Sequence, residues 1–217
     1  MPDAPADSAP LPCPKPMLVY TLLYGGMTVL AGVLGFKQVA LGPLAVECGI
    51  FAFLLLVVLS SSIAQLYGRQ SADRLVLWGF VPLAMSIVLI ALVLSLPPSA
   101  QMPPENVDAF GRVLSQTPRI MAAGPVAYGV SLFLNVRIFS ALRKGSDSGG
   151  VSMAVRGAIA SALSQVVDTL IFITLAFYGQ FPIGPLLVGQ MIAKVALSVV
   201  IVPPLIVLLV RLGRRWS

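Results

Sequence analysis

Long apolar runs separated by short polar connectors set the pattern of this chain. Six runs reach the length of about 20 residues that a helix needs to cross the hydrocarbon core of a bilayer. They are Met17–Phe36, Leu44–Leu66, Arg74–Leu96, Thr117–Leu142, Val151–Tyr178 and Gly184–Leu212. The pattern predicts an all-α membrane protein with six transmembrane helices, in which residues 17–212 form one transmembrane domain.

Prolines and polar residues mark where these runs should bend or end. Pro203 and Pro204 should break or bend the sixth run, because proline removes a backbone donor and clashes with the preceding turn. Pro82 and Pro125 are expected to act in the same way nearer the ends of their runs. The long connector before the fourth run contains Asn106–Leu114, whose apolar residues predict a short helix on the membrane surface.

Composition and charge support this picture. The chain is 58% hydrophobic and 10% charged, whereas soluble domains carry about 25% charged residues. Its net charge of +6 does not indicate a nucleic-acid partner, because no basic stripe interleaved with aromatic residues is present. By the positive-inside rule both termini are cytoplasmic, with residues 1–16 as a disordered N-terminus and 213–217 as a basic C-terminus. The cytoplasmic side then receives Lys15, Arg69, Arg74, Arg143, Lys144, Arg156, Arg211, Arg214 and Arg215, and the other side Lys37, Arg112 and Arg119.

The residue inventory narrows the chemistry. The chain has no histidine, and its two cysteines are Cys13 and Cys48. This leaves no disulfide framework, no metal-ligand pattern and no Ser-His-Asp set. A Walker-type phosphate loop is absent as well. The sequence therefore predicts no catalytic residues, no metal and no cofactor.

Polar residues inside the fifth run are the most informative ones. Ser161, Ser164, Gln165 and Asp168 fall on one helical face, with Phe172 one turn later. A charge in hydrocarbon costs about 2.5–3.5 kcal/mol on insertion scales, so it usually faces the bundle interior. The face is interpreted either as one wall of a polar binding site or as an interhelical hydrogen-bond clamp. The serines alone favour the clamp, whereas the charge of Asp168 favours the site.

The fourth run offers a second polar face. Tyr128, Ser131 and Asn135 share it at spacings of three and four residues and are predicted to form the opposite wall of the site. Arg137 lies off this face. It either contacts the ligand directly or extends to the membrane interface.

Two further charged positions complete the predicted site. Lys194 follows Gln190 by one turn and is expected to pair with Asp168, because buried charges are normally paired. Lys37 and Glu47 flank the start of the second helix and are expected at the outer interface, with a gating role as a further option. Asp168 is then the only acidic residue expected deep in the membrane.

Two blocks of the chain resemble the queuosine-precursor transporter family, which is of vitamin-uptake type. The first is GFKQVALGPLAVECGIFAFLLLVVLSSSIAQLYGRQSADRLVLWGF. The second, more specific, is PRIMAAGPVAYGVSLFLNVRIFSALRK with VRGAIASALSQVVDTLIFITLAFYG. Together they span about residues 20–205, and the second block carries Arg156, Ser161, Ser164, Gln165, Asp168, Thr169 and Phe172 of the family signature.

The chain departs from the family pattern at several positions. The family usually has acidic residues where this chain has Ser61, Gln65 and Asn135. Ser60, Ser61 and Ser62 either extend the polar cavity or bond to carbonyls of their own helix. These departures leave the cargo open between a queuosine precursor and a related compound.

The resemblance implies a multi-pass secondary transporter of the bacterial inner membrane. It would import 7-cyano-7-deazaguanine or a related 7-deazapurine by alternating access. Proton coupling through Asp168 is a separate hypothesis, based on the charge of this residue in the membrane. A carboxylate can accept the two adjacent N–H groups of a guanine-like edge. Gln165 and Asn135 would read the remaining polar atoms, and Phe172, Tyr128 or Phe133 would stack on the ring.

Other interpretations stay open at this point. The chain could import another small vitamin-like or nucleobase compound, or act as a non-transporting membrane scaffold. The expected partners are a small 7-deazapurine-like substrate and the lipid bilayer. Both a homo-oligomer and an external energising partner are compatible with the sequence.

Overall fold

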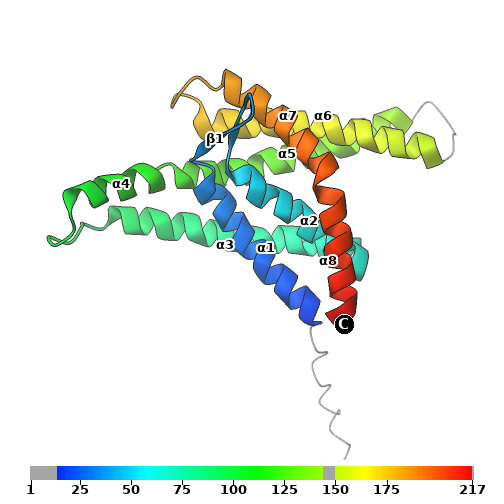
Figure 1. Ribbon diagram of the computed structural model, residues 1–217, viewed down its shortest axis with the longest axis horizontal. Helices are drawn as coiled ribbons and strands as arrows, with labels where there is room; N and C mark the ends of the chain where they lie inside the picture. The colour runs from blue at the N-terminus through cyan, green and yellow to red at the C-terminus, as the bar shows by residue number, and fades with distance from the viewer. Residues whose placement is uncertain (1–13, 144–149, 217) are drawn as a thin grey trace, which may run out of the picture.

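A computed structural model describes residues 14–143 and 150–216. Within these ranges the chain folds into eight α-helices and one antiparallel hairpin (Figure 1). The elements are α1 Lys15–Leu34, β1 Gln38–Leu41, β2 Leu44–Glu47, α2 Gly49–Tyr67, α3 Arg69–Ser95, α4 Pro104–Leu114, α5 Thr117–Arg143, α6 Gly150–Phe177, α7 Gly184–Val200 and α8 Val202–Trp216.

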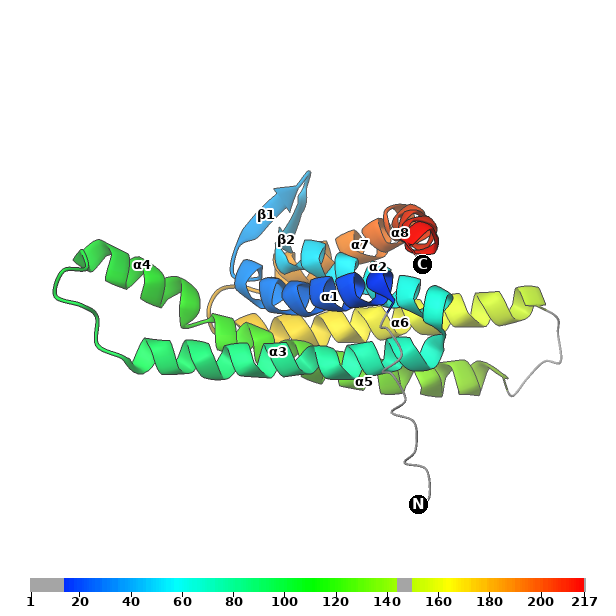
Figure 2. The same ribbon diagram turned by 90° about the horizontal axis from the view of Figure 1, so that it is seen from below.

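The helices form a bundle in which α5 and α6 run side by side (Figures 1 and 2). Figure 1 shows α3 nearly parallel to this pair, while α1 and α8 cross it steeply. Arg119 joins the start of α5 to the end of α6, since its guanidinium donates to the carbonyls of Leu175 at 2.7 Å and Tyr178 at 2.8 Å. A cation at this place also complements the negative end of the α6 dipole.

The described helices fit a membrane protein. Helices α1, α2 and α3 are each long and apolar enough to cross a bilayer, and α7 and α8 meet the same criterion together as a bent pair. The described part therefore contains three to four candidate spans. Helices α5 and α6 run for 27 and 28 residues, but six spans and cytoplasmic termini stay predictions.

Residues 38–47 correct the sequence-based prediction. The second apolar run does not begin as a helix, because Leu44–Glu47 is strand β2 and α2 starts only at Gly49. Strand β2 pairs with β1 in the register Gln38↔Glu47 to Leu41↔Leu44. Gly42 occupies the turn with φ +60°, a conformation that glycine adopts without strain. Strands of four residues are too short to show a clear alternation of polar and apolar side chains. The sequence pattern therefore does not separate β2 from the apolar run that follows it.

The proline predictions divide into two groups. The sixth run breaks at Ile201, just before Pro203 and Pro204, and α7 and α8 differ in direction by 43°. The predicted break is therefore confirmed. Pro82 and Pro125 lie inside α3 and α5, and these helices continue through them.

The predicted connector helix is confirmed as α4. Pro104 lies in its first turn, where the missing N–H of proline has no partner to lose. Glu105 lies in the first turn and Arg112 in the last, the arrangement that the helix dipole favours. Its location on the membrane surface stays a prediction.

Close backbone contacts position the elements around the bundle centre. The buried stripe of α1 repeats every four residues through Tyr20, Tyr24, Thr28 and Gly32, so it lies on one face of that helix. At the other side, the hairpin packs on α7 at Gly189, where a Cβ atom would collide with the backbone of Ala45. Only glycine allows this approach, and it brings the end of β2 against α7.

The contact at Gly189 predicts a specific stability effect. Gly189→Ala should lower the melting temperature of the detergent-purified protein, because the opposing atoms are backbone and overpacking typically costs about 1–3 kcal/mol. Gly184→Ala is the matched control on the same helix, since a Cβ atom there meets nothing within 4 Å. Equal thermal unfolding of the two variants would contradict the described contact.

Candidate functional site

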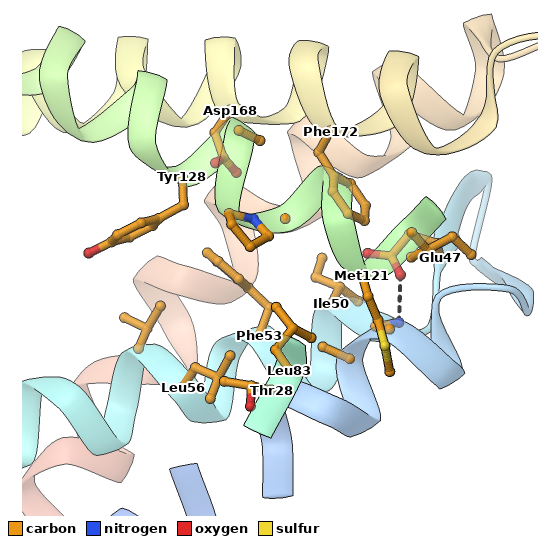
Figure 3. Close-up of a pocket in the computed structure, with 18 of the residues that line it drawn as sticks. Thr28, Glu47, Ile50, Phe53, Leu56, Leu83, Met121, Tyr128, Asp168 and Phe172 are labelled. Carbon is orange, nitrogen blue, oxygen red and sulfur yellow. Dashed lines mark hydrogen bonds between the residues drawn. The ribbon is translucent and has the colours of Figure 1, made fainter. Parts of the chain in front are cut away.

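A cavity of about 180 Å³ lies between α1, α2, α3, α5, α6, α7 and the end of β2 (Figure 3). This volume is below the ~300–1,000 Å³ typical of sites for drug-sized ligands, so the cavity suits a smaller molecule. Most of its wall is apolar or aromatic. The polar and ionisable side chains in the wall are Tyr24, Thr28, Glu47, Ser60, Tyr128, Asp168, Thr169, Gln190 and Lys194.

A buried ion pair crosses the cavity wall from α6 to α7. Lys194 Nζ donates to Asp168 Oδ2 at 2.5 Å, and the two residues are only 6% and 7% exposed. The ammonium nitrogen also lies 4.0 Å from the centroid of the Phe53 ring, a cation–π contact. The structure thus contains the pair that the sequence analysis expects, and the pair is neutral as a whole.

Glu47 provides a second buried carboxylate. It is only 3% exposed and lines the cavity. Asp168 is therefore not the only buried acidic residue in the described part of the chain. The expected place of Glu47 at the outer membrane interface stays a prediction. Its burial was not visible in the sequence, because Glu47 ends a strand that folds back against α7 and no helical pattern shows that return.

Hydrogen bonds join Glu47 to two helices. Its backbone N–H donates to Gln190 Oε1 at 3.1 Å, and Gln190 Nε2 donates back to Glu47 Oε1 at 2.6 Å. The N–H of Gly49, the first residue of α2, donates to Glu47 Oε2 at 2.6 Å (Figure 3). We call this arrangement of Glu47, Gln190 and Gly49 the hairpin clasp, because it ties β2 to both α7 and α2.

The surroundings of Glu47 favour the protonated, uncharged form of its carboxyl group. Burial raises the pKa of this carboxyl from 4.5 to about 7, although the Gly49 hydrogen bond, the Lys194 charge and the Gln190 hydrogen bond all act to lower it. Burial disfavours the charged form because the carboxylate loses its hydration. Glu47 lies in β2, outside the candidate membrane spans. Its protonation state therefore changes near neutral pH.

Aromatic rings supply the flat surfaces of the cavity. Phe172 on α6 and Phe53 on α2 both project into it from opposite sides (Figure 3). Tyr128 on α5 also lines it and meets the Phe80 ring edge-on, with centroids 6.2 Å apart. Phe133, the third stacking candidate, is 61% exposed instead. Aromatic faces of this kind suit a planar ligand.

The structure brings together part of the residue set that the sequence predicts. Asp168, Phe172, Tyr128 and Lys194 all line the cavity. Arg137 is exposed, and its guanidinium carbon lies 4.6 Å from the centroid of the Phe133 ring.

The remaining predicted residues lie elsewhere. Ser164 is 6% exposed and Gln165 is half-buried, but both lie outside the cavity lining. Ser131 donates its hydroxyl to the carbonyl of Tyr128 within α5. The side chains of Asn135 and Ser161 fall outside the described residues.

Several lining residues were missed by the sequence analysis. Tyr24 and Thr28 belong to the four-residue repeat of α1, which could have indicated an inward face. Thr169 belongs to the family signature but not to the predicted site residues, yet it lies in the wall and is 1% exposed. Phe53 cannot be singled out in the sequence, because it is one apolar residue among many.

Both roles that the sequence offers for Ser60 occur together. Ser60 lines the cavity, and its hydroxyl donates to the Val57 carbonyl of its own helix.

These groups are suited to binding a small, flat molecule with a polar edge. Carboxylates accept N–H donors, the ammonium donates to carbonyl oxygen, and the rings cover an aromatic face. Within residues 14–143 and 150–216, no three His, Cys, Asp or Glu side chains are grouped as metal ligands.

Two comparisons with known proteins give matches. The sequence model of the family described as "putative vitamin uptake transporter" matches residues 47–208. A probable queuosine precursor transporter of Bacillus subtilis (strain 168) is 26% identical to the chain over 183 residues, which cover 82% of this chain and 78% of that protein. No solved structure matches.

The buried ion pair predicts strong energetic coupling between two side chains. Asp168→Asn alone should destabilise the protein by about 3–5 kcal/mol, because it leaves the Lys194 ammonium buried without a counter-charge. The double variant Asp168→Asn with Lys194→Met should lose much less stability than the sum of the two single variants. Denaturant unfolding in detergent measures both quantities.

An exposed pair offers the matched control. Arg69 and Asp73 lie 3.8 Å apart, with side chains 89% and 70% exposed. Asp73→Asn should therefore change stability by no more than about 1 kcal/mol. Additive losses at Asp168 and Lys194 would show that their contact carries no energy.

Proposed function

The chain belongs to the family of putative vitamin uptake transporters, and on this premise we propose that it imports a queuosine precursor. The cargo is 7-cyano-7-deazaguanine or a related 7-deazapurine, taken across the bacterial inner membrane by alternating access. The similarity to a probable queuosine precursor transporter of Bacillus subtilis supports this choice of substrate. The structural observation that best supports the proposed function is the Asp168–Lys194 pair in a small cavity lined by aromatic rings.

The proposed recognition uses the donor and acceptor pattern of the base. A guanine-like edge carries two adjacent N–H donors beside a carbonyl acceptor. Asp168 accepts the donors, and Lys194 donates to the carbonyl. Before the substrate binds, Asp168 and Lys194 bond to each other at 2.5 Å. The bound substrate would weaken this ion pair and form charge-assisted hydrogen bonds with both side chains in return.

Stacking provides the second part of the recognition. Phe172 and Phe53 stand on opposite sides of the cavity (Figure 3), so a planar ring can lie against aromatic surface. Stacking of a base on an aromatic side chain is worth about 1–3 kcal/mol. The restricted volume of about 180 Å³ favours a free base over a nucleotide.

The architecture supports a transport cycle around this cavity. In the proposed topology, α1, α2, α3, α5, α6 and the α7–α8 pair are the six spans, with both termini cytoplasmic. Broken helices often form the substrate sites of secondary transporters. Here the break at Ile201 lies two turns after Lys194, on the helix that supplies half of the ion pair.

Ligand-dependent stabilisation tests the proposed substrate. The melting temperature of the detergent-purified chain should rise with 7-cyano-7-deazaguanine, because a ligand at 100 times its Kd stabilises the folded state by about 2.7 kcal/mol. Purines and water-soluble vitamins form the comparison panel. Stabilisation by a vitamin alone would replace the proposed cargo, and no stabilisation by any compound would favour a non-transporting scaffold.

Two variants test the proposed binding residues. Phe172→Leu should weaken binding about tenfold through loss of stacking, and Asp168→Asn should weaken it at least as much through loss of the acceptor. Asp73→Asn, which is far more exposed, should bind with the affinity of the wild type. Unchanged affinity in both Phe172→Leu and Asp168→Asn would refute the site assignment.

A further inference from the structure

The two buried carboxylates of the cavity differ in how they are neutralised. Asp168 has a full counter-charge, the Lys194 ammonium at 2.5 Å. Glu47 is bonded only to neutral donors, the side-chain amide of Gln190 and the backbone N–H of Gly49. Three ionisable groups of Asp, Glu and Lys type thus line the cavity, and with Glu47 ionised they sum to one negative charge. A proton on Glu47 would make the sum zero.

The hydrogen bonds of Glu47 are strongest with its ionised form. An ionised carboxylate is an acceptor at both oxygens, and both accept here, Oε1 from Gln190 and Oε2 from Gly49. A proton on Oε2 turns that oxygen into a hydroxyl, which is a weaker acceptor for the N–H of Gly49 and loses the charge assistance of the bond. A proton on Oε1 weakens the bond from the Gln190 amide in the same way.

Rotation of the Gln190 amide does not restore the lost strength. The rotated amide oxygen could accept from a protonated Oε1, but the amide nitrogen would then face the backbone N–H of Glu47. That N–H now donates to Gln190 Oε1 at 3.1 Å. Protonation at either oxygen therefore weakens the hairpin clasp, whose bonds join β2 to α7 and to α2.

We propose that Glu47, rather than Asp168, binds and releases the coupling proton, and that its protonation loosens the β1–β2 hairpin from the helices that it closes against. This inference rests on the proposed transport function. The two carboxylates then have separate roles: Asp168 binds the substrate, and Glu47 binds and releases the proton. The step is a simple protonation, in which the carboxylate gains a proton and loses its charge.

The surroundings of Glu47 suit this task. Gly35, just after α1, and Gly49, the first residue of α2, let backbone approach the carboxylate closely, and Ile120 of α5 packs beside Gly35. Burial among these groups raises the pKa of the Glu47 carboxyl to about 7, so the proton exchanges near physiological pH. The Lys194 charge on α7 acts on the Glu47 carboxyl, and Asp168 on α6 and Tyr24 on α1 line the same cavity. Cys48 follows Glu47 in the chain, and its N–H donates to the backbone carbonyl of Lys37.

Uptake into proteoliposomes tests the coupling role. The readout is the ratio of 7-cyano-7-deazaguanine uptake with and without an inward proton gradient. We expect the wild type to show a ratio well above one and Glu47→Gln a ratio near one, with substrate exchange still detectable in that variant. Glu105→Gln on the exposed helix α4 is the matched control and should keep the wild-type ratio. A wild-type ratio in Glu47→Gln would overturn the proposal.

Cys48 gives a second test that needs no substrate. It is half-buried beside the clasp, and Cys13→Ser makes it the chain's single cysteine. The rate of maleimide labelling of Cys48 is measured in this background with Glu47 and with Glu47→Gln, below and above pH 7. In each protein the labelling rate with a bulky maleimide is divided by the rate with a small maleimide at the same pH, so that the thiolate fraction, which the charge of Glu47 itself alters, cancels and the ratio reports access to the thiol.

The amide side chain of Glu47→Gln is uncharged and mimics the protonated carboxyl of Glu47, which gives the expected result. Above pH 7 this access ratio should be lower in the Glu47 protein than in Glu47→Gln, because its clasp is closed, and below pH 7 the two ratios should converge. A ratio that does not change with pH overturns the Glu47 assignment, even where transport is found. A pH-dependent ratio in a protein that neither binds nor transports the base supports the clasp and refutes the proposed function.

Discussion

The ammonium group of Lys194 is the constraint on which the rest of the cavity depends. A charge enclosed by apolar helices is stable only with a partner, and Asp168 on the neighbouring helix supplies it. The pair fixes how α7 stands against α6 and places one donor and one acceptor side by side in the wall. The Phe53 ring beneath the ammonium completes its surroundings. A single electrostatic requirement thus shapes both the packing and the binding chemistry.

The second organising contact is the approach of the hairpin to α7. Gly189 permits backbone contact with Ala45, and the next residue, Gln190, exchanges two hydrogen bonds with Glu47. Lys194 follows Gln190 by one helical turn. One face of α7 therefore carries, in sequence, the hairpin contact, the clasp and the ion pair. Any movement of the hairpin relative to α7 acts on the same wall that would bind the substrate.

The features that can be predicted from the sequence depend on the free energy of placing one residue, a charged one or a proline, in a single apolar helix. Asp168 and Lys194 stand out because charge is expensive in apolar surroundings, and the break before Pro203 follows from the chemistry of proline. The polar face of the fifth run identified Asp168 and Phe172 but not which of its neighbours reach the cavity. That depends on how α6 is rotated against α5 and α7, which helical spacing alone does not determine.

The unpredicted parts depend on contacts between distant segments. The burial of Glu47 becomes visible only when its strand is seen to fold back onto Gln190, 143 residues later. The hairpin itself is hidden because β1 and β2 each have four residues and adjoin a long apolar helix. Phe53 lines the cavity only because of its position on α2, since its residue type matches its neighbours. Long-range packing, rather than local propensity, decided each of these features.

Binding selectivity at equilibrium tests the central claim most directly, that a carboxylate in this cavity reads the two adjacent N–H groups of a deazaguanine. The measurement compares the Kd of 7-cyano-7-deazaguanine with that of the analogue lacking the exocyclic amine, on the purified chain. Loss of one charge-assisted hydrogen bond predicts that the analogue binds about 10–100-fold more weakly. Equal affinities for the two compounds would contradict the account.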